Sequence, residues 1–121
     1  MKNLILSLLF VLVSTITFGQ TTQKVMIDGV NINEKQDVEY IELLYFQKFM
    51  SFKVRCVVDY GQPLEWTSDT RVQTEDGTVQ NFNSVIDGLN YFTKNGWEFV
   101  SNYPVTVNGT NVYHYLLKRK K

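Results

Sequence analysis

The sequence predicts an α+β fold, with a four- or five-stranded antiparallel sheet and one helix packed on one of its faces, in the order ββ-loop-α-ββ. Three observations lead to this prediction. Apolar residues recur at spacing two over residues 41–45 and again over 52–58, as in half-buried strands. Residues 85–92 carry the only clear helical spacing, and Asn108-Gly109 separates two β-favouring runs, which is a strong hairpin signal.

The first residues have the pattern of a secretory signal. Lys2 precedes an apolar run over residues 4–13, and Thr17 and Gly19 fit the small-residue positions before a cut at Gln20. A membrane anchor needs about 20 apolar residues, and this run is shorter. We therefore expect residues 1–19 to be a cleaved signal peptide, the mature chain to be periplasmic or secreted, and no stable membrane insertion after cleavage.

Composition indicates a packed globular chain. The 12 Lys and Arg balance the 12 Asp and Glu, 44% of the residues are hydrophobic, and 14% are aromatic. A neutral charge gives no reason to expect a nucleic-acid partner. Cys56 is the only cysteine, so an exported product has no internal disulfide. We expect residues 20–36 to be a leader or short strand, and residues 37–121 to be a single α+β domain.

The first elements are predicted from alternation and turn residues. Residues 25–33 surround Asp28-Gly29 and predict a short strand or hairpin. Two antiparallel strands follow, separated by a break near Met50-Ser51. The apolar side chains of these strands are Ile41, Leu43 and Tyr45 on the first, and Phe52, Val54, Cys56 and Val58 on the second.

A loop, a turn and the helix come next. Gly61-Gln62-Pro63 ends the second strand, residues 64–70 form a loop that contains Trp66, and Glu75-Asp76-Gly77 predicts a small hairpin or ordered loop. The helix starts after Asn83 or Ser84, with Ser84 and Asp87 as a capping box, and stops at Asn95-Gly96. Gly88 weakens it by about 1 kcal/mol relative to alanine, so the helix needs tertiary packing.

The last two strands form the predicted hairpin around Asn108-Gly109. A two-residue loop places Val105 opposite Val112, Tyr103 opposite His114, and Glu98 opposite Arg119 as a charge pair. Neither predicted face is polar, and a single helix covers only one of them, so the other is packed by loops or meets a partner. One face carries Trp97, Phe99, Tyr103, His114 and Leu116, and the other carries Val100, Tyr113, Tyr115 and Leu117.

Three segments together carry a resemblance. They are Leu89-Asn90, then Gly96-Trp97-Glu98-Phe99-Val100, then residues 112–119 with the sequence VYHYLLKR. The chain resembles a family of small exported bacterial domains of unknown function with an LN…GWE…KR core. Residues 38–44 and 54–62 also resemble the corresponding segments of exported members of this family in Gram-negative bacteria. The resemblance implies a helix that ends in glycine before a tryptophan-led hairpin, and a place in the cell envelope. It implies no activity and no catalytic residues.

The candidates for chemistry are few. His114 is the only histidine, which excludes a site with two imidazoles but permits a general base. Cys56 could act as a nucleophile with His114, but it shares its strand face with apolar residues and is better read as core. The carboxylates Asp59, Glu65, Asp69, Glu75, Asp76 and Glu98 show no paired arrangement. We therefore expect no catalytic set, no cofactor and no metal site.

The chain is rich in aromatic residues, which make up 14% of the sequence. The candidate binding residues are Trp66, Tyr103, Tyr113, His114 and Tyr115, because tyrosine and tryptophan combine a large apolar surface with a polar group. We interpret the protein as a non-enzymatic binding module of the cell envelope, whose partner is another protein or a second copy of itself. The alternatives are a small hydrolase or isomerase with His114 as general base, and a structural accessory subunit. The basic residues 118–121 are either a solvated end or a contact for an acidic partner.

Overall fold

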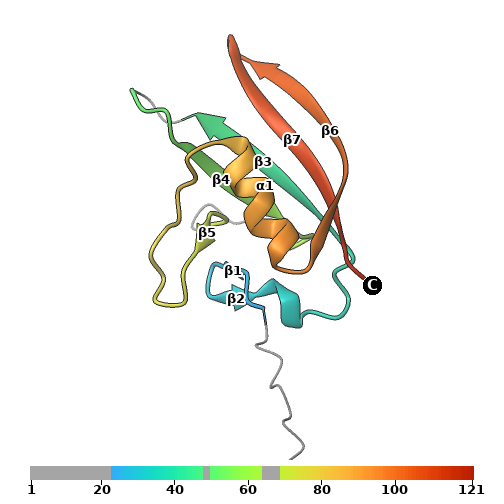
Figure 1. Ribbon diagram of the computed structural model, residues 1–121. Helices are drawn as coiled ribbons and strands as arrows, with labels where there is room; N and C mark the ends of the chain where they lie inside the picture. The colour runs from blue at the N-terminus through green and yellow to red at the C-terminus, as the bar shows by residue number, and fades with distance from the viewer. Residues whose placement is uncertain (1–22, 48–49, 64–68) are drawn as a thin grey trace, which may run out of the picture.

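The computed structural model describes residues 23–47, 50–63 and 69–121, and its main layer is a four-stranded antiparallel sheet (Figure 1). The strand order is β4-β3-β7-β6. The strands are β3 (Tyr40–Gln47), β4 (Val54–Asp59), β6 (Trp97–Val107) and β7 (Thr110–Arg119), and the helix α1 (Val85–Lys94) lies across one face. The α+β prediction is confirmed. The predicted signal peptide and Trp66 lie outside the described residues.

Three short strands make a second, smaller sheet. They are β1 (Met26–Ile27), β2 (Val30–Asn31) and β5 (Val72–Gln73), and their order in the sheet is β2-β1-β5. The short 3₁₀ helix η1 (Ile32–Glu34) directly follows β2 in the chain. Asp28 and Gly29 both have positive φ, as the predicted tight turn between β1 and β2 requires. Val25, Ile27 and Ile32 are fully buried in the main core, so this N-terminal segment is part of the same folded unit.

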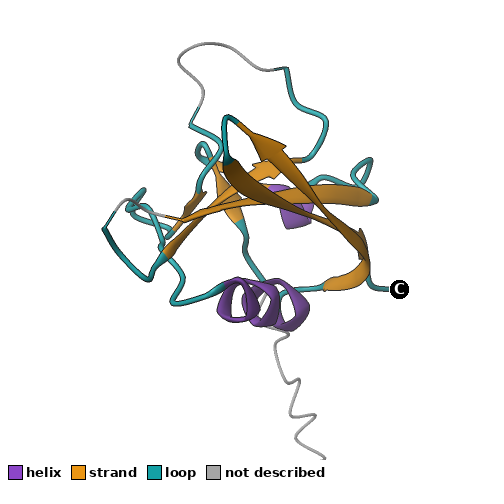
Figure 2. Ribbon diagram, turned by 90° about the horizontal axis from the view of Figure 1, so that it is seen from above, coloured by secondary structure: helices purple, strands orange, loops and turns teal. Residues whose placement is uncertain are grey.

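The helix covers the sheet face that carries Leu43, Tyr45 and Leu117. The pairings Ile41↔Leu117 and Tyr45↔Cys56 place these residues on one side of the sheet. Phe92 of α1 belongs to the same buried cluster, and Gly88 packs against the Tyr45 ring. Figure 2 shows α1 on one side of the sheet, away from its opposite face. We call the face opposite α1 the outer face.

The predicted helix signals form as expected. The Asp87 amide donates to Ser84 Oγ at 3.2 Å, and the Asp87 carboxylate accepts from the Asn83 amide at 2.9 Å. Gly96 follows the helix with a φ of 96°, a conformation in which a glycine has no side-chain penalty. Within the part of the chain that the structure describes, no helix is long and apolar enough to span a bilayer.

A β-bulge at Val100 changes the register of the last hairpin. Val105↔Val112 and Tyr103↔His114 pair as predicted, but the register shifts between Phe99 and Ser101. The predicted Glu98–Arg119 pair is therefore wrong. Glu98 lies opposite Lys118 instead, and their charged groups are 3.2 Å apart.

The same bulge corrects the prediction of the two faces. An extra residue reverses the alternation, so Trp97 and Phe99 point to the helix side and not to the side of Tyr103. Trp97 is fully buried and Phe99 approaches Tyr115, whereas Tyr103 and His114 belong to the outer face.

The prediction that Phe52 lies in a strand and shares a buried face with Val54 is also wrong. β4 begins at Val54, and Phe52 is 96% exposed. Met50, two residues earlier, has a φ of 57°, so the chain turns there and the extended alternation starts only after Phe52.

Candidate functional site on the outer face

The outer face combines apolar side chains from all four strands of the main sheet. Leu44 of β3 lies opposite His114, and Tyr103 lies opposite the same histidine from the other side. These residues, with Leu116 and Val57, are exposed or half-buried, because α1 lies on the other side of the sheet. The same face carries charged side chains, since Arg55 lies opposite Phe46, Asp59 opposite Glu42 and Lys118 opposite Tyr40. Between them, Leu44, Val57 and Leu116 surround a polar cluster.

That cluster consists of Glu42, His114 and Tyr103. The Nδ1 atom of His114 lies 2.8 Å from Glu42 Oε1, and the Tyr103 hydroxyl donates to Glu42 Oε2 at 3.0 Å. The Tyr103 and His114 rings are stacked, with centroids 4.8 Å apart and planes at 15°. One carboxylate from β3 therefore holds two aromatic side chains from β6 and β7.

The arrangement determines which atoms of the cluster can act on a ligand. A carboxylate only accepts hydrogen bonds, so the short contact places a proton on His114 Nδ1 and leaves Nε2 outside the contact with Glu42. The hydrogen bond to Glu42 raises the pKa of the Tyr103 hydroxyl, which keeps it protonated and donating. The cluster can thus offer a nitrogen acceptor or base beside an aromatic ring.

The structure separates the five predicted binding residues. His114 and Tyr103 come together on the outer face, but Tyr113 and Tyr115 lie on the helix side of β7. Tyr115 packs its ring edge-on against Tyr45, with centroids 5.5 Å apart, so it belongs to the margin of the core. Tyr113 is exposed and lines a cavity of about 320 Å³ beside the β6–β7 turn. Trp66 is not among the described residues.

Glu42 is the site residue that sequence reasoning missed. Its neighbours in the chain form no motif that predicts a role for its carboxylate. Its alternation with Ile41 and Leu43 shows that it faces away from the core. Only the pairing of β3 with β7, which joins residues 72 positions apart, reveals that it meets His114.

The possible nucleophilic pair of Cys56 and His114 does not exist. Cys56 lies opposite Tyr45 on the helix side of the sheet, whereas His114 is on the outer face. The thiol is fully buried, and burial raises its pKa, which disfavours the reactive thiolate. In the part of the chain that the structure describes, no three metal-binding side chains gather.

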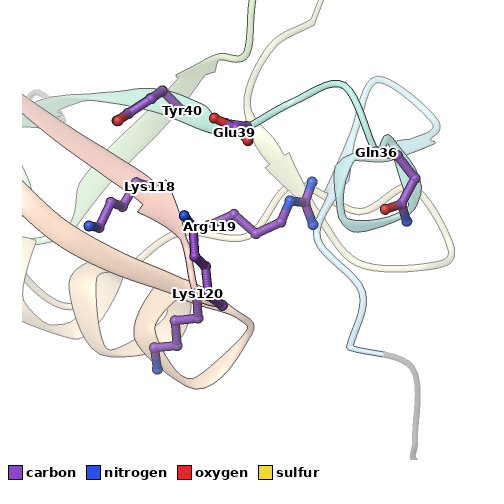
Figure 3. Close-up of a pocket in the computed structure, with 7 residues that line it drawn as sticks. Gln36, Glu39, Tyr40, Lys118, Arg119 and Lys120 are labelled. Atoms are coloured by element: carbon purple, nitrogen blue, oxygen red, sulfur yellow. The ribbon is translucent and has the colours of Figure 1, made fainter.

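A cavity of about 280 Å³ near the C-terminus is lined by the predicted basic tail (Figure 3). Figure 3 shows that the side chains of Lys118, Arg119 and Lys120 point in different directions and do not converge on one point. Lys118 pairs with Glu98, Arg119 donates to four backbone carbonyls, and Lys120 donates to the carbonyl of Thr93. These cations act within the fold, so the cavity is a poor anion site.

Comparisons with protein-family models, with curated proteins and with solved structures found no match to this chain. The resemblance to small exported domains therefore stays a prediction.

Proposed function

We propose that the protein is a non-enzymatic binding module of the bacterial cell envelope, exported by its N-terminal signal, and that its outer face docks a protein partner. The observation that carries the proposal is the Glu42–His114–Tyr103 cluster, which lies beside Leu44 and Leu116 on the sheet face opposite α1. A second copy of the chain is the alternative partner. No nucleic acid is involved in this proposal.

The chemistry of the face supports protein binding. Protein interfaces place aromatic side chains and a few well-ordered hydrogen-bonding groups within an apolar centre. Here Leu44 and Leu116 flank His114, whose ring is held by Glu42 and stacked on Tyr103. Because the cluster is already ordered, little side-chain entropy would be lost when a partner binds.

Replacing Tyr103 with alanine is expected to weaken association with the partner by about tenfold or more, because it removes an aromatic contact at the centre of the face. The protein is purified gently from its own host, its co-purifying partner is identified by native mass spectrometry, and the affinity of each variant is then titrated.

Tyr113 supplies the matched control. It is 43% exposed against 46% for Tyr103, and it lies one residue from His114 but on the helix side. Tyr113→Ala should bind the partner like the unmodified protein. Equal losses from both variants, or no loss from either, would show that the outer face is not the docking surface.

A second candidate function rests on the 2.8 Å contact between Glu42 and His114. A carboxylate that orients a histidine is an arrangement used for general-base catalysis, so a small hydrolase or isomerase is the alternative proposal. His114→Gln should then lower turnover by about 10²- to 10⁴-fold while the protein stays folded. Glu42→Gln should lower it less, since the base itself remains.

The measurement for this alternative is a broad screen with hydrolase and isomerase substrates, followed by the two variants and a circular dichroism check of folding. Absence of turnover across the screen counts against an enzyme. If His114→Gln loses turnover but keeps the partner, catalysis and docking are separate properties of the same face.

A further inference from the structure

The tip between β3 and β4 presents the most exposed large apolar side chains in the described part of the chain. Met50 is 90% exposed and Phe52 is 96% exposed. Burial of such a side chain is favourable by about 1.5–3 kcal/mol. The exposure of two of them at neighbouring positions therefore favours a role in binding an apolar partner. Neither is on the outer face, and neither takes part in the function proposed above.

The backbone of the tip is constrained. Met50 has a φ of 57°, in the left-handed region that side chains other than glycine and asparagine rarely adopt. The Lys53 amide donates to Ser51 Oγ at 3.1 Å, which orders the turn before β4 begins. An apolar side chain therefore occupies a position where a small polar residue or glycine would be the ordinary choice.

Other apolar side chains lie at the same end of the molecule. The pairing of Tyr45 with Tyr113 places the end of β3 beside the start of β7, next to the β6–β7 turn. Val107 before that turn and Ile86 in the first turn of α1 are both exposed. Figure 1 shows the end of β3, the β6–β7 turn and the start of α1 toward the same end of the fold, where Gln47, Gly109 and Val85 line one cavity.

The charges next to the tip are positive. Lys53 and Arg55 are both exposed, and residues 50–58 contain no Asp or Glu. Asp69 is close enough to Arg55 for the two charges to interact, but its carboxylate is paired with Arg71 at 2.6 Å. Residues 103–117, which include the neighbouring turn, carry no Lys, Arg, Asp or Glu. Asp87 is the acidic group of the adjacent helix start, and its carboxylate is held by the Asn83 amide.

We propose that Met50 and Phe52 insert into the interfacial region of an anionic lipid bilayer, with Lys53 and Arg55 at the phosphate headgroups. Apolar side chains that enter the headgroup and acyl boundary, flanked by cations, are the pattern of peripheral membrane binding. Two exposed apolar side chains favour a bilayer over a protein, because a protein interface buries a broad face and a bilayer needs no matching shape. The contact is reversible and involves no membrane-spanning segment.

The test is sedimentation of the exported, purified protein with vesicles. Mixed phosphatidylglycerol and phosphatidylcholine vesicles should bind the protein, phosphatidylcholine vesicles should bind it more weakly, and added salt should reduce the difference. Met50→Ser with Phe52→Ser should lower the bound fraction on anionic vesicles by about tenfold or more. Lys53→Gln with Arg55→Gln should remove the preference for anionic vesicles.

Tyr40→Ser is the matched control, because Tyr40 is an exposed aromatic residue at the start of β3, the opposite end of that strand. It should bind vesicles as the unmodified protein does. The tip residues are exposed, so their replacement should leave the thermal unfolding midpoint unchanged, and this is measured alongside.

The proposal is overturned if the unmodified protein does not bind anionic vesicles, or if the Met50 and Phe52 variant binds them equally well. It is also overturned if that variant loses only a protein partner, which would make the tip a protein contact. If the Met50 and Phe52 variant loses vesicle binding but still binds the partner whose affinity depends on Tyr103, the tip binds lipid independently of the outer face.

Discussion

Replacing Arg119 with methionine is expected to destabilise the protein by about 3 kcal/mol, although the residue lies in the basic run of residues 118–121. Its Nε donates to the carbonyl of Val38 at 3.0 Å and its Nη1 to that of Asn33 at 3.1 Å. Its Nη2 donates to the carbonyls of Lys35 and Ile32. The guanidinium also lies 4.8 Å from the centre of the Trp97 ring.

The expected loss is large because the contacts cannot be replaced by another cation. Only the planar guanidinium reaches several carbonyls at once, so Arg119→Lys should lose most of the same stability. The segment before β3 would keep the burial of Val25 and Ile32 and the hydrogen bond that Asn33 accepts from Trp97 Nε1 at 2.8 Å, so the variant is expected to fold with reduced stability. Urea unfolding of the purified variants measures the difference in free energy.

Lys121→Met is the control for this experiment, because it removes one exposed positive charge from the same tail. Its unfolding free energy should differ from that of the unmodified protein by less than about 0.5 kcal/mol. If Arg119→Met is as mild as this control, the carbonyl contacts contribute nothing to stability and the tail is only a solvated end.

Replacing Gly88 with alanine is expected to destabilise the protein by about 2 kcal/mol, against the sign of helix propensity. A Cβ at this position would lie 2.5 Å from the Tyr45 hydroxyl oxygen and 2.6 Å from its Cε1 atom. Such a contact forces α1 or the tyrosine to move. In an exposed helix position the same change would stabilise the protein by about 1 kcal/mol.

Tyr45→Phe tests the cause of this effect. The Tyr45 hydroxyl is buried without a hydrogen-bond partner in the structure, and burial, with a smaller effect of the Cys56 thiol, raises its pKa. Its removal should therefore change stability little. In the Gly88→Ala background it should recover part of the loss, because the hydroxyl contact disappears while the ring contact stays.

Asn90→Ala, on the exposed side of α1, is the matched helix substitution and should be slightly stabilising. Thermal and urea unfolding of the four variants measure the coupling between positions 45 and 88. A Gly88→Ala protein as stable as Asn90→Ala would mean that α1 and β3 are not packed as closely as the structure shows.

The sequence predicts one contact of the outer-face cluster and misses another. The pairing of Tyr103 with His114 follows from a two-residue turn at Asn108-Gly109, and it was predicted from the sequence. The alternation of the last strand also predicts that Tyr113 and Tyr115 lie on the face opposite His114, so the five aromatic candidates could not form one site. Glu42 was missed because its contact depends on which strand lies beside β7.

Local signals alone determined the helix and the turns of this protein. Ser84 and Asp87 start α1, Gly96 follows its end, and Asn108-Gly109 closes the last hairpin, because each depends on backbone conformations within a few residues. The same local signals determined the α+β order of the elements.

Only the tertiary structure decided which face is covered and which residues meet. The bulge at Val100 reverses the alternation of β6, the uncovered face brings Glu42 to His114, and Arg119 joins the N-terminal segment to the sheet. These outcomes depend on pairing and packing between residues far apart in the chain. The free energy of each pairing depends on how its side chains pack across the whole core, so no short segment of the sequence specifies it.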